Sequence, residues 1–133
     1  MYFSIEYNGR SYSEMTEESA KEAGIPDEAI VEAKKLVRIG LVKAECRRRI
    51  YAEASAETQM NMATAGAFIS SKTASARSEE DKTVLAGIEA SLAWVAQMRG
   101  RVTELADDAT LDIADDANWP PLPDGARDVV DKF

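Results

Sequence analysis

Apolar side chains recur at helical spacing from Val84 to Leu105, and this pattern constrains the fold more than any other feature of the chain. Side chains three, four or seven positions apart lie on one face of an α-helix. Trp94 and Met98 flank the line and widen that face. We therefore predict a long amphipathic helix over residues 78–105, with an apolar face made by Val84, Ile88, Leu92, Val95, Val102 and Leu105.

A second apolar line lies upstream, within residues 41–69. Small, polar residues follow it over 70–77 and predict a connection. Ser78 and Asp81 then have the spacing of a capping box that begins the next helix. Two arms of similar length joined by a short connection are expected to pack antiparallel, as a long helical hairpin. The upstream line passes through Cys46, Ile50, Ala54, Ala65 and Phe68, and Thr58 and Asn61 interrupt it.

The first fourteen residues predict a small β-hairpin. Apolar and polar side chains alternate from Tyr2 to Tyr7, as they do in a half-exposed strand. Asn8-Gly9 follows, and this dipeptide favours the positive backbone angles of a two-residue hairpin turn. Such a hairpin is marginally stable alone, so it is expected to pack on the helices or on a partner.

Helices are predicted over residues 16–69. Thr16 fits the N-cap of a short helix that Gly24 ends, and Pro26 fits the first turn of the next helix. The apolar spacing continues through Gly40. That continuity favours one unbroken helix, although a glycine at this position leaves a kink open.

Residues 106–133 form an acidic tail. They carry two basic and eight acidic side chains, against nine and eight in residues 41–105. Pro120 and Pro121 disfavour helix, so we expect an extended strap on the surface, followed by a short helical turn. Trp119 is either an anchor for a partner or a side chain that folds back onto its own domain. The candidate docking residues of this strap are Asp115, Asp116, Trp119 and Leu122.

Together these elements predict one domain over residues 1–133, mainly α, with a long antiparallel helical hairpin, the N-terminal β-hairpin and the acidic strap. An oligomeric, coiled-coil-like bundle of such hairpins is left open. The apolar face is broad enough to invite self-association through residues 41–105, with the strap outside that interface. The candidate core and self-association residues are Ile50, Ala54, Asn61, Phe68, Ile88, Leu92, Val95 and Val102.

The composition excludes several kinds of catalytic site. The chain has no histidine, which removes Ser-His-Asp triads and imidazole metal sites. Its single cysteine, Cys46, is expected to be a buried small side chain. The aspartates of 107–116 lack the ligand spacing of a calcium-binding EF-hand loop. We therefore expect no metal, no cofactor and no enzymatic activity, and a hydrolase with paired carboxylates is the alternative.

The charge of the chain, −8, disfavours nucleic acid and anionic membrane surfaces as partners. The one basic run, Arg47-Arg48-Arg49, is either an anion site or a set of helical ion pairs. Glu45 and Glu53, each four residues from Arg49, favour ion pairs. No apolar run approaches the ~20 residues of a membrane span, and the start lacks a secretory signal, so we expect synthesis in the cytoplasm.

The segment from Lys43 to Asn61, KAECRRRIYAEASAETQMN, resembles a helix of small bacteriophage tail-associated or tail-fibre assembly proteins. The order of features over residues 24–120 is also similar: Gly24-Ile25-Pro26, the arginine-rich helix, Ala93-Trp94-Val95 and Trp119-Pro120. The resemblance implies a non-enzymatic structural component or adaptor of the tail-fibre or baseplate region, located in the virion tail. It implies homo-oligomerisation, with three copies by analogy to fibres, and contacts with other tail or fibre proteins. A tail-fibre assembly chaperone that leaves before the virion is complete is the alternative.

Overall fold

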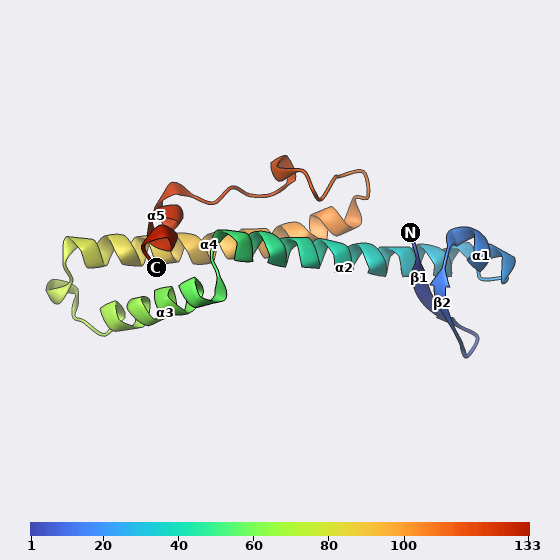
Figure 1. The fold of residues 1–133 in the computed structure, drawn as a ribbon, viewed down its shortest axis with the longest axis horizontal. Coiled ribbons are helices and arrows are strands. Elements are labelled where there is room, and N and C mark those ends of the chain that lie inside the picture. Colours follow the sequence, from blue (N-terminus) through green and yellow to red (C-terminus); the bar gives the residue numbers. More distant parts are fainter.

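Two long helices, α2 (Asp27–Glu53) and α4 (Glu79–Asp107), set the shape of the molecule (Figure 1). A computed structural model describes all 133 residues and is mainly helical, with one small N-terminal sheet. The remaining elements are β1 (Phe3–Tyr7), β2 (Arg10–Met15), α1 (Glu17–Glu22), α3 (Ala56–Ser70) and α5 (Asp124–Lys132), and two single 3₁₀ turns, η1 (Ala74–Ala76) and η2 (Asp116–Asn118).

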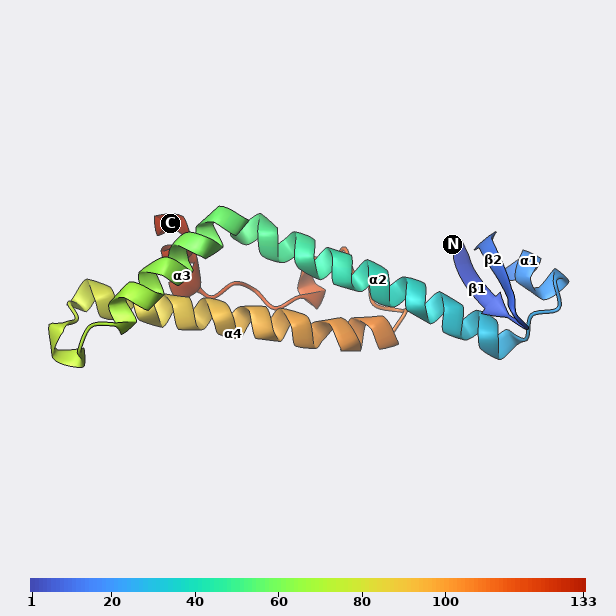
Figure 2. The same cartoon turned by 90° about the horizontal axis from the view of Figure 1, so that it is seen from below.

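The β-hairpin is present where the sequence predicts it. Its strands are antiparallel, and Asn8 and Gly9 take φ angles of 50° and 74° in the turn. The second strand runs on to Met15, past an irregularity where Glu14 has a φ of 53°. The hairpin packs on the N-terminal end of α2. This end of α2 extends beyond α4 (Figure 2). The small core at this end contains Phe3, Ala20, Ile25, Ile30 and Ala33.

The predicted helix signals upstream of residue 41 are also confirmed. Thr16 caps α1 by accepting a hydrogen bond from the Ser19 backbone N–H at 3.1 Å. Gly24 has a φ of 80°, the left-handed conformation that closes the helix. Beyond Pro26, α2 continues without a break through Gly40.

The arm predicted as one helix over residues 41–69 is instead two helices that meet at an elbow. Ala54 is extended, with φ −143° and ψ 116°, and ends α2. Ser55 then caps α3 by accepting a hydrogen bond from the Thr58 backbone N–H at 3.1 Å. The chain bends here, so that α3 continues past the end of α2 and slants toward the first half of α4 (Figure 2). A Ser N-cap within a run of small residues stabilises a new helix start at little steric cost.

The face that α4 buries agrees only in part with the predicted one, since Val84 and Leu105 are buried as predicted but Leu92 is not. Its buried residues are Val84, Gly87, Trp94, Met98, Leu105 and Ala106. The prediction that Leu92 belongs to the core of the chain is wrong, because its side chain is 66% exposed. Phe68, at 65% exposed, and Asn61 also face solvent. The other predicted core residues, Ile50, Ala54, Ile88, Val95 and Val102, are partly buried.

The acidic tail is part of the core, contrary to the prediction that it lies outside it. Trp119 is 6% exposed and packs in one cluster with Val42, Cys46 and Met98. Beyond the prolines, the chain forms α5, which packs against α4. The apolar side chains of the tail are spaced to cover α4, and this long-range contact overrides the acidic composition that favours an exposed strap.

The contrast between two leucines of α4 gives a stability prediction. Leu105 is 0% exposed, so Leu105→Ala is expected to lower the free energy of unfolding by about 2–5 kcal/mol. Leu92→Ala removes an exposed side chain and is expected to cost about 0.5 kcal/mol or less. Urea denaturation followed by tryptophan fluorescence measures both. Equal losses for the two variants would contradict this assignment of the core.

Candidate docking groove

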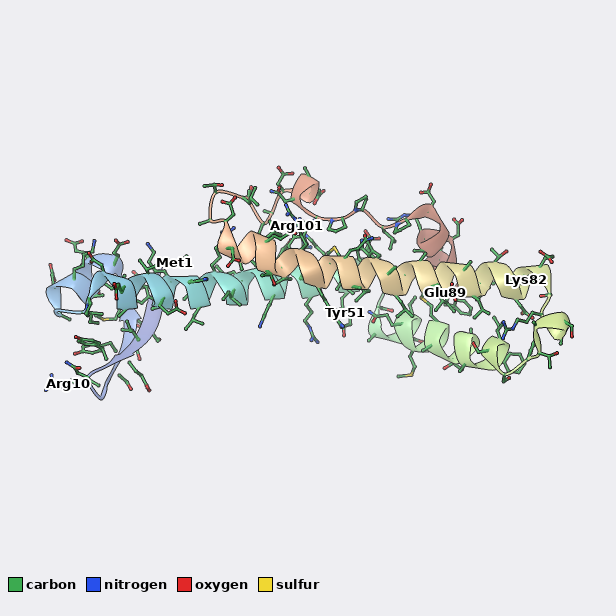
Figure 3. The ribbon with its side chains drawn as sticks, turned by 180° about the vertical axis from the view of Figure 1, so that it is seen from behind. Met1, Arg10, Tyr51, Lys82, Glu89 and Arg101 are labelled. Atoms are coloured by element: carbon green, nitrogen blue, oxygen red, sulfur yellow. The ribbon has the colours of Figure 1, made fainter.

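One of the two grooves between α2 and α4 is closed by the chain itself. The segment 108–123, which we call the strap, runs along this groove (Figure 1). The Trp94 indole N–H donates to the Pro120 carbonyl at 2.9 Å, and Arg101 donates to the Asn118 carbonyl at 2.8 Å. In Figure 3, Arg101 lies on the strap side of the helices and Tyr51 on the opposite side. The strap therefore covers one side of the α2–α4 pair, which we call the closed side, although a cavity of about 410 Å³ remains between the strap and the two helices. The opposite side is the open side.

Arginines of α2 complete the attachment of the strap. Arg38 donates to three carbonyls, those of Leu105, Asp108 and Leu111, at 2.8–2.9 Å. Arg49 donates to the Ala114 carbonyl at 3.0 Å and to the Asp116 carboxylate at 2.8 Å. These bonds satisfy a carbonyl in the last turn of α4 and hold the strap at its start and in its middle.

The open side contains an apolar cavity at the elbow, with a volume of about 220 Å³. Its walls come from the end of α2, the start of α3, the middle of α4, and the tail. Of its thirteen lining residues, ten are hydrophobic. Those predicted as core or docking residues are Ile50, Ala54, Ile88, Leu92, Val95 and Leu122.

A second, shallower cavity of about 450 Å³ continues from the first between α2 and α4. The two share Ile50, Gln59 and Val95, so they form one continuous depression, which we call the elbow groove. Val102 lines the second part. The cationic side chains of Lys43, Arg47 and Arg99 also line it. The elbow groove is therefore apolar at one end and cationic at the other.

The cations of the elbow groove have no anionic partner within the chain. Lys43, Arg47 and Arg99 form no ion pair and donate no side-chain hydrogen bond; Arg10, in the β-hairpin, is the other cation of this kind. The Arg47 guanidinium lies 5.0 Å from the centre of the Tyr51 ring. This stacking fixes the charge near the groove but does not neutralise it.

Cys46 lies at the floor of the cationic part and is 4% exposed, which confirms the prediction of a buried small side chain. Burial raises the pKa of the Cys46 thiol, and the nearby Arg99 charge acts in the opposite direction. The thiol therefore stays protonated at neutral pH and contributes apolar surface rather than a nucleophile.

The basic run forms ion pairs, as the sequence favours, but not with both predicted partners. Glu45 pairs with Arg48 at 2.7 Å and with Arg49 at 2.8 Å, and the hydrogen bond from Arg48 is the main cause of its lowered pKa. Glu53 pairs instead with Arg127 of α5 at 3.2 Å. α5 packs against α4 and α3, which brings Arg127 to this carboxylate, and the sequence spacing does not indicate this contact.

The four predicted docking residues of the tail are used mainly within the chain. Asp115 caps η2, Asp116 pairs with Arg49, and the Trp119 indole N–H donates to the Ile113 carbonyl at 2.8 Å. Trp119 therefore folds back onto its own domain and is not available as an anchor for a partner. Leu122 is half-buried at the apolar end of the elbow groove.

The cationic residues of the groove are absent from the predicted site, although the sequence carries a signal for them. Lys43, Arg47 and Arg99 have no acidic residue three or four positions away on either side. Arg48, by contrast, has Glu45 three positions before it. A helical cation without such a neighbour lacks the common local ion pair. Lys34 and Arg38 meet the same criterion but bind Glu17 and backbone carbonyls, so the criterion alone does not locate the groove.

Neither a scan against protein-family models nor a search of the curated proteins found a match for this chain. The structure has no group of three or more acidic or cysteine side chains placed to hold a metal ion. No helix combines the length and the apolar character needed to cross a bilayer.

Proposed function

We propose that this chain is a non-enzymatic protein of a bacteriophage tail, a structural component or adaptor of the tail-fibre or baseplate region that acts through helix packing. The observation that carries the proposal is the elbow groove. Residues 43–61, over which the sequence resembles tail-associated proteins, form the end of α2, the elbow and the start of α3. The resembling segment therefore supplies one wall of an uncovered apolar surface.

Exposed apolar side chains support a role in contact with other proteins, one of them at the groove on α4 and two on α3. Leu92 is 66% exposed, Met60 69% and Phe68 65%. Soluble monomers rarely leave extended apolar surface open to water. Self-association through residues 41–105, with three copies by analogy to fibres, and contacts with other tail proteins are both part of the proposal.

Quantitative mass spectrometry of purified phage particles tests the location. A structural component is expected in every particle at a fixed copy number relative to the major tail protein. An assembly chaperone is expected in the lysate, bound to fibre or tail precursors, and absent from particles. Absence from particles and from all such precursors would refute the proposal.

A substitution at the groove tests whether this surface makes the contact. Leu92→Asp is expected to reduce the amount of the chain in particles by about thirtyfold, because an anchor in an interface contributes about 2 kcal/mol or more. Leu36→Asp is the matched control, since Leu36 is 61% exposed on α2 but lies outside the groove. Equal incorporation of both variants would show that the groove is not the contact surface.

A further inference from the structure

We propose that the elbow groove binds an acidic segment of a partner protein, with an apolar anchor in the elbow cavity and carboxylates beside Lys43, Arg47 and Arg99. This inference rests on the proposed function, because it names the chemistry of the partner that the groove receives. The occupant is a short stretch of chain rather than a flat surface, since the groove is a depression between helices.

The closed side of the molecule shows which kind of segment fits between these helices. There the strap is acidic, with Asp112, Asp115 and Asp116 on its path, and its apolar anchor is Trp119. It is held by arginines that reach carbonyl and carboxylate oxygens. The open side has the same two components, an apolar floor and arginines at its edge, without a segment to fill them.

Charge gives the strongest argument for an anionic occupant. The chain has a net charge of −8, and most of its cations are already paired internally. Three of the four cations without a partner line one groove. A local positive site on an acidic protein attracts carboxylates at short range. The remaining surface repels acidic segments, so such a segment binds at the groove and not elsewhere on the protein.

The apolar end defines the other half of the recognition. The elbow cavity, about 220 Å³, has room for one large side chain, and its lining is almost entirely apolar. Leu92, at its rim, is 66% exposed and gains burial when the cavity is filled. An aromatic or large aliphatic anchor therefore fits, and its burial supplies affinity while the carboxylates fix the direction of the segment.

A second copy of this chain is a poorer occupant than a partner. The acidic segment that a copy could offer, 106–133, is folded onto its own helices through Trp119 and α5. Releasing it would expose the core of the donor.

Selection from a displayed library of random 12-residue peptides, with the full chain as the target, tests the inference. The enriched peptides are expected to carry two or more Asp or Glu residues and one aromatic or large aliphatic residue. Synthetic versions are expected to bind more weakly at 0.5 M than at 0.05 M salt. Their dissociation constants are measured by fluorescence anisotropy against the wild type and its variants.

Three charge-reversal variants locate the binding site. Arg47→Glu and Arg99→Glu are each expected to weaken binding by about fivefold or more, the loss of one favourable pair. Arg10→Glu makes the same charge change on another unpaired cation, far from the groove, and is expected to change binding less than twofold. All three side chains are exposed, so circular dichroism and thermal unfolding should match the wild type.

Several outcomes would overturn the inference. They are enrichment no greater than with an unrelated acidic protein, enrichment of neutral or basic peptides, or equal binding by the Arg99→Glu and Arg10→Glu variants. A wild-type dimer that Arg99→Glu dissociates, seen by sedimentation, would assign the groove to a second copy. The peptide experiments use the isolated protein, whereas the proposed function is tested by the presence of the chain in phage particles. Failure of one test is therefore distinguishable from failure of the other.

Discussion

Replacing Gly87 by alanine is expected to displace α5 and to lower the free energy of unfolding by about 1–3 kcal/mol. A Cβ atom at this position would lie 2.0 Å from Cγ2 of Val129 and 2.7 Å from the carbonyl oxygen of Gly125. The first contact could be relieved by a side-chain rotation. The second involves the backbone of α5, so the whole helix has to move away from α4. Movement of α5 also exposes Ala126 and Val129, which are buried against α4.

Gly100→Ala is the matched control in the same helix. A Cβ atom at Gly100 has nothing within 4 Å, so this change is expected to stabilise the protein by up to about 1 kcal/mol through helix propensity. Urea denaturation at constant pH measures both variants. A Gly87→Ala protein as stable as the Gly100→Ala protein would mean that α5 does not pack on α4 in solution.

Elements fixed by short-range interactions were predictable from the sequence. The Asn8-Gly9 turn, the Thr16 cap and the Ser78-Asp81 capping box each depend on residues within four positions of one another. Such signals can be recognised from the sequence alone, because the hydrogen-bond donor and acceptor are only a few residues apart in the chain. Their predicted positions were therefore correct to within a few residues.

The buried face of α4 was not predictable in the same way. Apolar residues surround α4 on two sides, and both Leu92 and Trp94 fit a helical stripe. The choice between them is made by α5 and the strap, which cover the side of Gly87, Trp94 and Met98. Contacts between residues far apart in the sequence decide this, and periodicity carries no information about them.

The candidate site was predictable only in part. Ile50, Leu92 and Val95 were expected to contribute to one apolar surface, and they line the elbow groove. Its cationic half was missed because a basic run draws attention to Arg48 and Arg49, which are paired. The informative residue was Arg47, whose helical neighbours at three and four positions include no acid.

Removal of the Trp119 side chain is expected to cause the largest loss of stability of any single substitution in the tail. Trp119 is 6% exposed, its indole N–H donates to the Ile113 carbonyl at 2.8 Å, and the Arg49 guanidinium lies 5.4 Å from its ring centre. Trp119→Ala leaves a cavity in the main core and is expected to lower the free energy of unfolding by about 3–5 kcal/mol. It also removes the stacking surface of Arg49, which holds the Ala114 carbonyl of the strap.

Trp119→Phe separates packing from hydrogen bonding. Phenylalanine keeps most of the apolar contact and a ring for the Arg49 guanidinium, but it leaves the Ile113 carbonyl without its donor. A loss of about 1–2 kcal/mol is therefore expected, smaller than that of Trp119→Ala. Urea denaturation measures the order, and hydrogen exchange at residues 108–123 shows whether the strap has detached. If Trp119→Ala unfolds like the wild type and the strap stays protected, the tail is held by the arginines alone and Trp119 is not part of the core.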